Sequence, residues 1–129
     1  MAGSTNHNLI GERAIPKGST KTITIYVLDK NNAPVDISGS KLWSMVRENI
    51  EDATAVISKA NAAAGGTGMV ITDGPGGVLT LDWDKTDTAN RNDDQHCWDV
   101  LIELISGKRG FVIKPGARVE FETPATRDV

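Results

Sequence analysis

The sequence has a single cysteine, Cys97, which excludes an intrachain disulfide and favours a fold that forms in a reducing compartment. No apolar stretch approaches the roughly 20 residues of a transmembrane helix, so no membrane partner is expected. Residues 1–16 lack the basic start and apolar run of a signal peptide. The formal net charge of −3 at pH 7 argues against a nucleic-acid partner, because such a partner usually requires a basic patch.

Metal ligands are also scarce in this sequence. His96 and Cys97 are adjacent, but the only other histidine is His7, and zinc normally takes four ligands of this type. The pair does not suit a catalytic dyad, because neighbouring residues of a strand point to opposite faces. We therefore expect structural roles for both residues, with no catalytic site, no metal and no other cofactor.

Five aspartates gather in residues 82–94 and raise the question of a calcium site, which needs several oxygens converging on one point. They are Asp82, Asp84, Asp87, Asp93 and Asp94. Their spacing is not that of an EF-hand loop, and Lys85 and Arg91 interrupt them. A solvated loop is the favoured interpretation, with calcium binding as the alternative. One helical turn beginning at Asp84 or Thr86 is predicted within this stretch.

Short segments with a period of two dominate the rest of the chain, and turn residues separate them. The predicted strands are 21–29, 41–47, 56–58, 69–72, 78–83, 96–105, 111–113 and 118–123. A helix is the rival interpretation of 96–105, but its Trp, Val and Ile content favours a strand. A loop is predicted at 60–68. Seven or eight short antiparallel strands without a long helix predict an all-β sandwich or barrel.

The first 18 residues differ from the rest of the chain. They are polar and rich in Gly, Ser and Asn, and their apolar residues Leu9, Ile10 and Ile15 follow no period. We therefore predict a flexible N-terminal arm at 1–18 that adds nothing to the core, followed by one domain at 19–129. Such an arm gains order by docking on a partner, so Leu9, Ile10 and Ile15 are candidate interface residues.

Residues 41–47 carry apolar side chains on both faces of a strand. If Leu42 and Val46 face the core, Trp43 and Met45 lie on the outer face and become candidate interface anchors. The alternative is a register in which Trp43 takes the core position and Leu42 faces outward. The other two tryptophans, Trp83 and Trp98, are predicted to lie in the core.

Three segments of the chain combine strands and turn residues in a characteristic order. The first is TITIYVLDKNNAPVDISGSKLWSMVR, a strand followed by a turn and a second strand. The second is DATAVISK, followed after a Gly-rich gap by MVITDGPGGVLTLDWDKTDTA. The third is WDVLIELISGKRGFVIKPGARVEFETPATR. Together they resemble the immunoglobulin-like domains of bacteriophage tail and baseplate proteins. The resemblance covers about residues 19–127 and implies an immunoglobulin-like β-sandwich.

The same resemblance implies a non-catalytic virion structural protein, such as a baseplate, tail-fibre adaptor or head-decorating component. Its partners would be other virion proteins and further copies of itself in a homo-oligomer. Its location would be the virion, after assembly in the host cytoplasm. The alternative function is a carbohydrate-binding or adhesin module, in which Trp43 would stack on a host-surface glycan.

Overall fold

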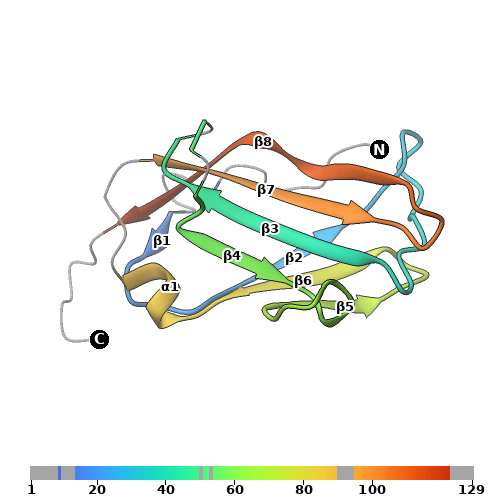
Figure 1. The fold of residues 1–129 in the computed structure, drawn as a ribbon, viewed down its shortest axis with the longest axis horizontal. Coiled ribbons are helices and arrows are strands. Elements are labelled where there is room, and N and C mark those ends of the chain that lie inside the picture. Colours follow the sequence, from blue (N-terminus) through green and yellow to red (C-terminus); the bar gives the residue numbers. More distant parts are fainter. Residues whose placement is uncertain (1–8, 10–13, 50, 53, 90–94, 123–129) are drawn as a thin grey trace.

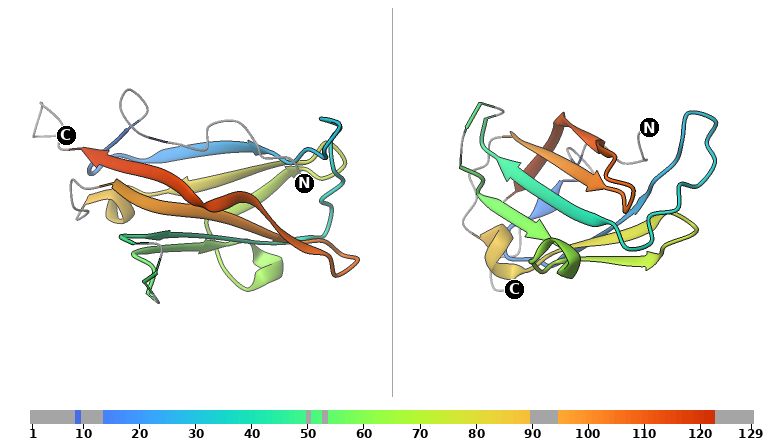
Figure 2. Two further views of the ribbon diagram at one scale, coloured as in Figure 1. Left: turned by 90° about the horizontal axis from the view of Figure 1, so that it is seen from above. Right: turned by 45° about the vertical axis from the view of Figure 1, so that its right-hand side comes forward.

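The computed structural model describes residues 9, 14–49, 51–52, 54–89 and 95–122, and these form an all-β fold of two sheets (Figure 1). The larger sheet has the order β1 (Ile15–Pro16), β8 (Arg109–Glu122), β7 (Gln95–Glu103), β3 (Lys41–Arg47) and β4 (Ile57–Ala60). The smaller sheet has the order β2 (Lys21–Tyr26), β6 (Val78–Trp83) and β5 (Met69–Asp73). The two sheets lie in separate layers, and the views in Figure 2 show one above the other.

Alternation in the sequence decides which face of each strand is buried. In β2, Ile23 and Ile25 are buried, whereas the residues between them are exposed. In β6, Leu79 and Leu81 are fully buried and face the same core. The strands predicted at 69–72 and 78–83 form β5 and β6, which pair as an antiparallel hairpin with Met69 opposite Leu81. The apolar residues of both sheets therefore meet in one shared core.

Trp83 and Trp98 occupy this core, as predicted, and join the two sheets. Their ring centroids lie 5.9 Å apart in a T-shaped arrangement, which is a favoured geometry for aromatic pairs. Phe121 of β8 packs against Trp83 with a centroid distance of 6.0 Å. All three side chains are 1% exposed or less, so they form an aromatic centre between the layers.

Two short helical segments interrupt the strands. Helix α1 (Lys85–Ala89) confirms the helical turn predicted in the acidic stretch, and Asp84 caps it by accepting a hydrogen bond from the Asp87 backbone N–H at 2.9 Å. The predicted loop at 60–68 contains a 3₁₀ helix, η2 (Ala62–Ala64), capped by Asn61. Among the described residues, no helix has the length and apolar character needed to cross a membrane.

The segment after η2 also links the two sheets. The Ala60 backbone N–H of β4 donates to the Thr67 carbonyl at 3.0 Å, and the Asp82 N–H of β6 donates to the Gly68 carbonyl at 2.8 Å. Gly68 has a φ of +96°, and a Cβ at this position would lie 2.5 Å from Lys59 Cδ. Glycine therefore suits this crossing, where a left-handed backbone approaches a neighbouring side chain closely.

The prediction that residues 1–18 add nothing to the core is wrong for Leu9 and Ile15, which are 4% and 1% exposed. Ile15 pairs with Phe121 in a parallel ladder, so β1 extends the larger sheet beyond β8. Leu9 exchanges backbone hydrogen bonds with β8 through Arg118 and Glu120, at 2.8 Å each. Hydrogen bonds to a sheet edge require no period in the added segment, which explains why the sequence pattern missed it.

The predicted strands at 111–113 and 118–123 belong to a single strand, β8. Pro115 and Gly116, which lie between the two predicted strands, fall where the register with β7 shifts between Trp98 and Val100. A local irregularity of this kind accommodates a proline within a strand, because the proline nitrogen need not donate to the ladder.

The burial of Ile15 leads to a first prediction. Ile15→Ala should lower the free energy of unfolding by about 2–5 kcal/mol, the usual cost of truncating a fully buried isoleucine. Val70→Ala, at a side chain that is 54% exposed on β5, is the control and should change it by less than about 0.5 kcal/mol. Urea unfolding followed by circular dichroism measures both. Equal stability of the two variants would contradict the docking of this segment on its own domain.

Candidate protein-binding face

The outer face of the larger sheet carries the two residues that the sequence singles out. In β3, Leu42 and Val46 are fully buried, whereas Trp43 and Met45 are half-buried on the opposite face. The structure therefore has the register in which Leu42 faces the core. The alternative register, with Trp43 in the core, is wrong.

Trp43 belongs to an apolar row that crosses four strands. It lies opposite Ala60 of β4 on one side and Leu101 of β7 on the other. Leu101 in turn lies opposite Phe111 of β8. Residues directly opposite each other in an antiparallel pair point to the same face. We call these four residues the apolar row, and its end at Phe111 is 41% exposed.

A charged row runs beside the apolar row, near the end of the sheet where β7 turns into β8. Glu103 lies between Lys41 and Arg109, with an Arg109 Nη2–Glu103 Oε1 distance of 2.8 Å and a Lys41 Nζ–Glu103 Oε2 distance of 4.0 Å. The Arg109 guanidinium also lies 5.2 Å from the centroid of the Trp43 ring, within cation–π range. Arg109 thus holds Trp43 in place and covers part of one face of its ring.

A buried carboxylate lies on the other side of the apolar row. Asp99 of β7 accepts hydrogen bonds from the Met45 backbone N–H and from Arg47 Nη1, both at 3.3 Å. Burial raises the pKa of the Asp99 carboxyl above its usual value of 3.8, and these two partners offset only part of that effect. The Ser44 hydroxyl donates to the Asp99 carbonyl at 2.7 Å and fixes the backbone of β7 against β3.

Of the other interface candidates predicted from the sequence, Leu9 and Ile15 do not contribute to this face. Leu9 and Ile15 lie in the core of their own chain and are closed to a partner. Ile10 lies outside the described residues. The sequence missed Leu101 and Phe111 as members of this face. The alternation within 96–105 nevertheless puts Leu101 on the face of the strand that points away from Trp98.

His96 and Cys97 are both buried, and they contact different neighbours. The His96 ring packs edge-on against Phe121, with centroids 5.2 Å apart, whereas Cys97 Sγ accepts a hydrogen bond from Arg118 Nη1 at 3.2 Å. In the part of the chain that the structure describes, no three His, Cys, Asp or Glu residues converge as a metal site would require.

The described aspartates of the 82–94 stretch each serve a local contact. Asp82 accepts from the Thr22 hydroxyl, and Asp87 forms an ion pair with Lys59 at 2.8 Å. Hydrogen bonds from Thr86 and the Asp87 backbone lower the pKa of Asp84 to about 2. Asp93 and Asp94 lie outside the described residues. The three described carboxylates thus make structural contacts at the end of β6 and in α1.

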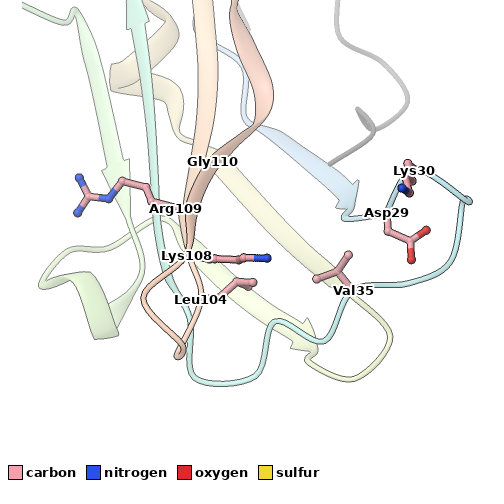
Figure 3. A pocket seen from close by; sticks show the side chains of 7 residues that line it. All are labelled: Asp29, Lys30, Val35, Leu104, Lys108, Arg109 and Gly110. Atoms are coloured by element: carbon pink, nitrogen blue, oxygen red, sulfur yellow. The ribbon is translucent and has the colours of Figure 1, made fainter.

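A hollow of about 520 Å³ opens beyond the charged row, between the loop that follows β2 and the turn from β7 to β8 (Figure 3). Val35 and Leu104 give it an apolar lining, and Lys30 and Lys108 give it charge. In Figure 3 the Lys108 side chain points across the hollow toward the loop, whereas Arg109 points away from it.

Comparison with known proteins gives little further information. No family model matches the sequence, and no curated protein matches it. Among solved structures, the chain is similar to MtrC from Shewanella baltica, with a TM-score of 0.43 and 16% sequence identity. The match covers 88% of this chain and 22% of the MtrC chain. A similarity this weak carries no argument about fold or function.

The two faces of β3 lead to a second prediction. Leu42→Ala should lower the free energy of unfolding by about 2–5 kcal/mol, because it leaves a cavity in the core. Trp43→Ala should lower the free energy of unfolding by much less, because the Trp43 side chain is half-buried on the outer face and its loss leaves no enclosed cavity. Thermal and urea unfolding of both variants test the order, and a larger loss for Trp43→Ala would contradict this register.

The raised pKa of Asp99 leads to a third prediction. Ionisation of Asp99 is harder in the folded state than in the unfolded state, so this group contributes most to stability below pH 3.8, and that contribution is lost as the pH rises through the raised pKa. Asp99→Asn removes this dependence, so its stability relative to the unmodified protein should rise as the pH increases from 3 to 7. Glu48→Gln, in an exposed position, controls for the loss of one negative charge. A pH-independent difference would contradict the assignment.

Proposed function

We propose that this chain is a non-catalytic structural protein of a bacteriophage virion, an immunoglobulin-like β-sandwich that works by binding other virion proteins. The observation that carries the proposal is the apolar row on the outer face of the larger sheet. An antiparallel sheet with one face in water needs apolar residues only on its inner face. A second apolar row on the outer face is typical of a surface that a partner covers.

The composition of this face fits a protein partner. Trp and Arg are enriched among the residues that dominate binding energy at protein interfaces, and here Arg109 stacks on Trp43 next to the exposed ring of Phe111. Charged residues flank the apolar row on both sides, through Glu103 and Asp99. An apolar centre with a polar rim is the usual anatomy of an interface.

The turn residues of the phage-like segments support the resemblance. Asp29 Oδ1 accepts from the backbone N–H groups of Asn31 and Ala33, at 2.8 and 3.0 Å. Asp36 and Asp73 close two further turns in the same way, by accepting backbone N–H groups at 3.0 Å. These aspartates fall within the resembling segments and hold the connections between strands, which gives their spacing a structural reason.

The carbohydrate-binding alternative has less support. It needs an open face of Trp43 on which a sugar ring stacks, but the Arg109 guanidinium lies over that ring at 5.2 Å. A glycan array probed with the purified chain tests this alternative directly.

A fourth prediction tests the proposed function. Antibodies raised against the chain should label intact virus particles from the host that produces it, and mass spectrometry of those particles should detect it. Trp43→Ala with Phe111→Ala should weaken incorporation, because losing one buried aromatic anchor costs about 2 kcal/mol of binding, or roughly thirtyfold in Kd. The control variant Val70→Ala should be incorporated normally. Purified particles without the chain would refute the virion assignment.

A further inference from the structure

The hollow at one end of the larger sheet has a net positive lining. Its charged residues are three basic ones and one acidic one: Lys30, Lys108, Arg109 and Asp29. Its loop wall is held by the hydrogen bonds that Asp29 accepts from Asn31 and Ala33. Its other wall is the turn from β7 to β8, in which the Leu104 N–H donates to the Lys108 carbonyl at 2.7 Å. Lys30 and Lys108 are exposed, and neither forms an ion pair with any described residue. Two ammonium groups beside an apolar lining favour the entry of carboxylates.

A compact acidic turn lies at the opposite end of the same sheet, between β3 and β4. The Asp52 N–H donates to the Asn49 carbonyl at 3.0 Å, and the Asn49 N–H donates back to Asp52 Oδ2 at 3.1 Å. Arg47 Nε also donates to the Asp52 carbonyl, at 3.0 Å. This turn displays the exposed carboxylates of Glu48 and Glu51, which form no ion pair within the described part of the chain.

The two features lie at opposite ends of β3. Lys41, at the start of β3, pairs with Glu103 next to the β7–β8 turn, whereas Arg47, at its end, leads into the acidic turn. Figure 1 shows the β3–β4 connection and the β7–β8 turn on opposite sides of the molecule. One copy therefore cannot bring its own turn to its own hollow, but a second copy can do so.

We propose that copies of this chain join head to tail, with Glu48 and Glu51 of one copy placed at the hollow of the next, between Lys30 and Lys108. This proposal rests on the proposed function and names a second copy as one of the partners. Contact between two unlike surfaces is heterologous, so repeated contacts form a closed ring or an open filament. The apolar row takes no part in this contact and remains open for a different virion protein.

Charge reversal tests the contact. Sedimentation velocity and native mass spectrometry of the full chain should show self-association in 0.05 M salt that weakens about tenfold or more in 0.5 M salt, because salt screens exposed charges. The pair Lys30→Glu and Lys108→Glu should weaken self-association at least about tenfold, and so should the pair Glu48→Lys and Glu51→Lys. An equimolar mixture of the two double variants should associate again, because each then offers the charge that the other lacks.

A matched control separates this contact from a general effect of net charge. Lys21→Glu with Lys85→Glu changes the net charge by the same amount as the hollow variant, at exposed positions that belong to neither feature. Circular dichroism and thermal unfolding confirm that each variant is folded. The control should associate like the unmodified chain.

The possible failures are distinguishable. If the chain stays monomeric at low salt, or if the control substitutions weaken self-association as much as the hollow substitutions do, the head-to-tail contact is overturned. Antibody labelling of particles can still support the virion assignment in either case. The head-to-tail contact is also overturned if Trp43→Ala with Phe111→Ala abolishes self-association and charge reversal does not. That result would place the contact between copies at the apolar row. Rescue by mixing, together with particles that lack the chain, upholds the contact and refutes the virion assignment.

Discussion

The packing of Trp83 against Trp98 is the interaction on which the rest of the structure depends. Trp83 ends β6 of the smaller sheet, and Trp98 lies in β7 of the larger one, so their edge-to-face contact sets how the two layers meet. Phe121 packs on the same centre, and its ladder partner is Ile15. The aromatic centre therefore links the layers to β8 and to the N-terminal segment, in a core that contains no disulfide.

Because the inner faces of both sheets are buried in this core, contacts with other molecules must use the outer faces or the turns at the ends of the sheets. On the smaller sheet, the exposed apolar residues Tyr26 and Val70 lie on the two edge strands, with β6 between them. On the larger sheet, adjacent strands bring Trp43, Leu101 and Phe111 into one row. This row across adjacent strands of the larger sheet is the feature on which the proposed partner contact rests.

Carboxylates in this protein mainly shape the backbone. Asp29, Asp36 and Asp73 close turns, and Asp84 caps α1. Asp99 ties β7 to β3 despite the cost of its burial. Such roles account for several of the 17 acidic residues of the chain. The exposed Glu48 and Glu51 close no turn of this kind, and this sets them apart as candidate contacts.

The sequence by itself determined the strand character of most segments and the side of β6 and β7 that is buried, because a period of two acts locally along each strand. For β3 it left two registers open, because this strand has apolar residues on both faces. It also determined the helical turn at α1 through the capping aspartate. Only the tertiary structure decided that Leu9 and Ile15 fill the core, that β8 runs on through Pro115, and that Phe111 lies beside Leu101. Each of these depends on the register between segments distant in sequence, which a local pattern does not contain.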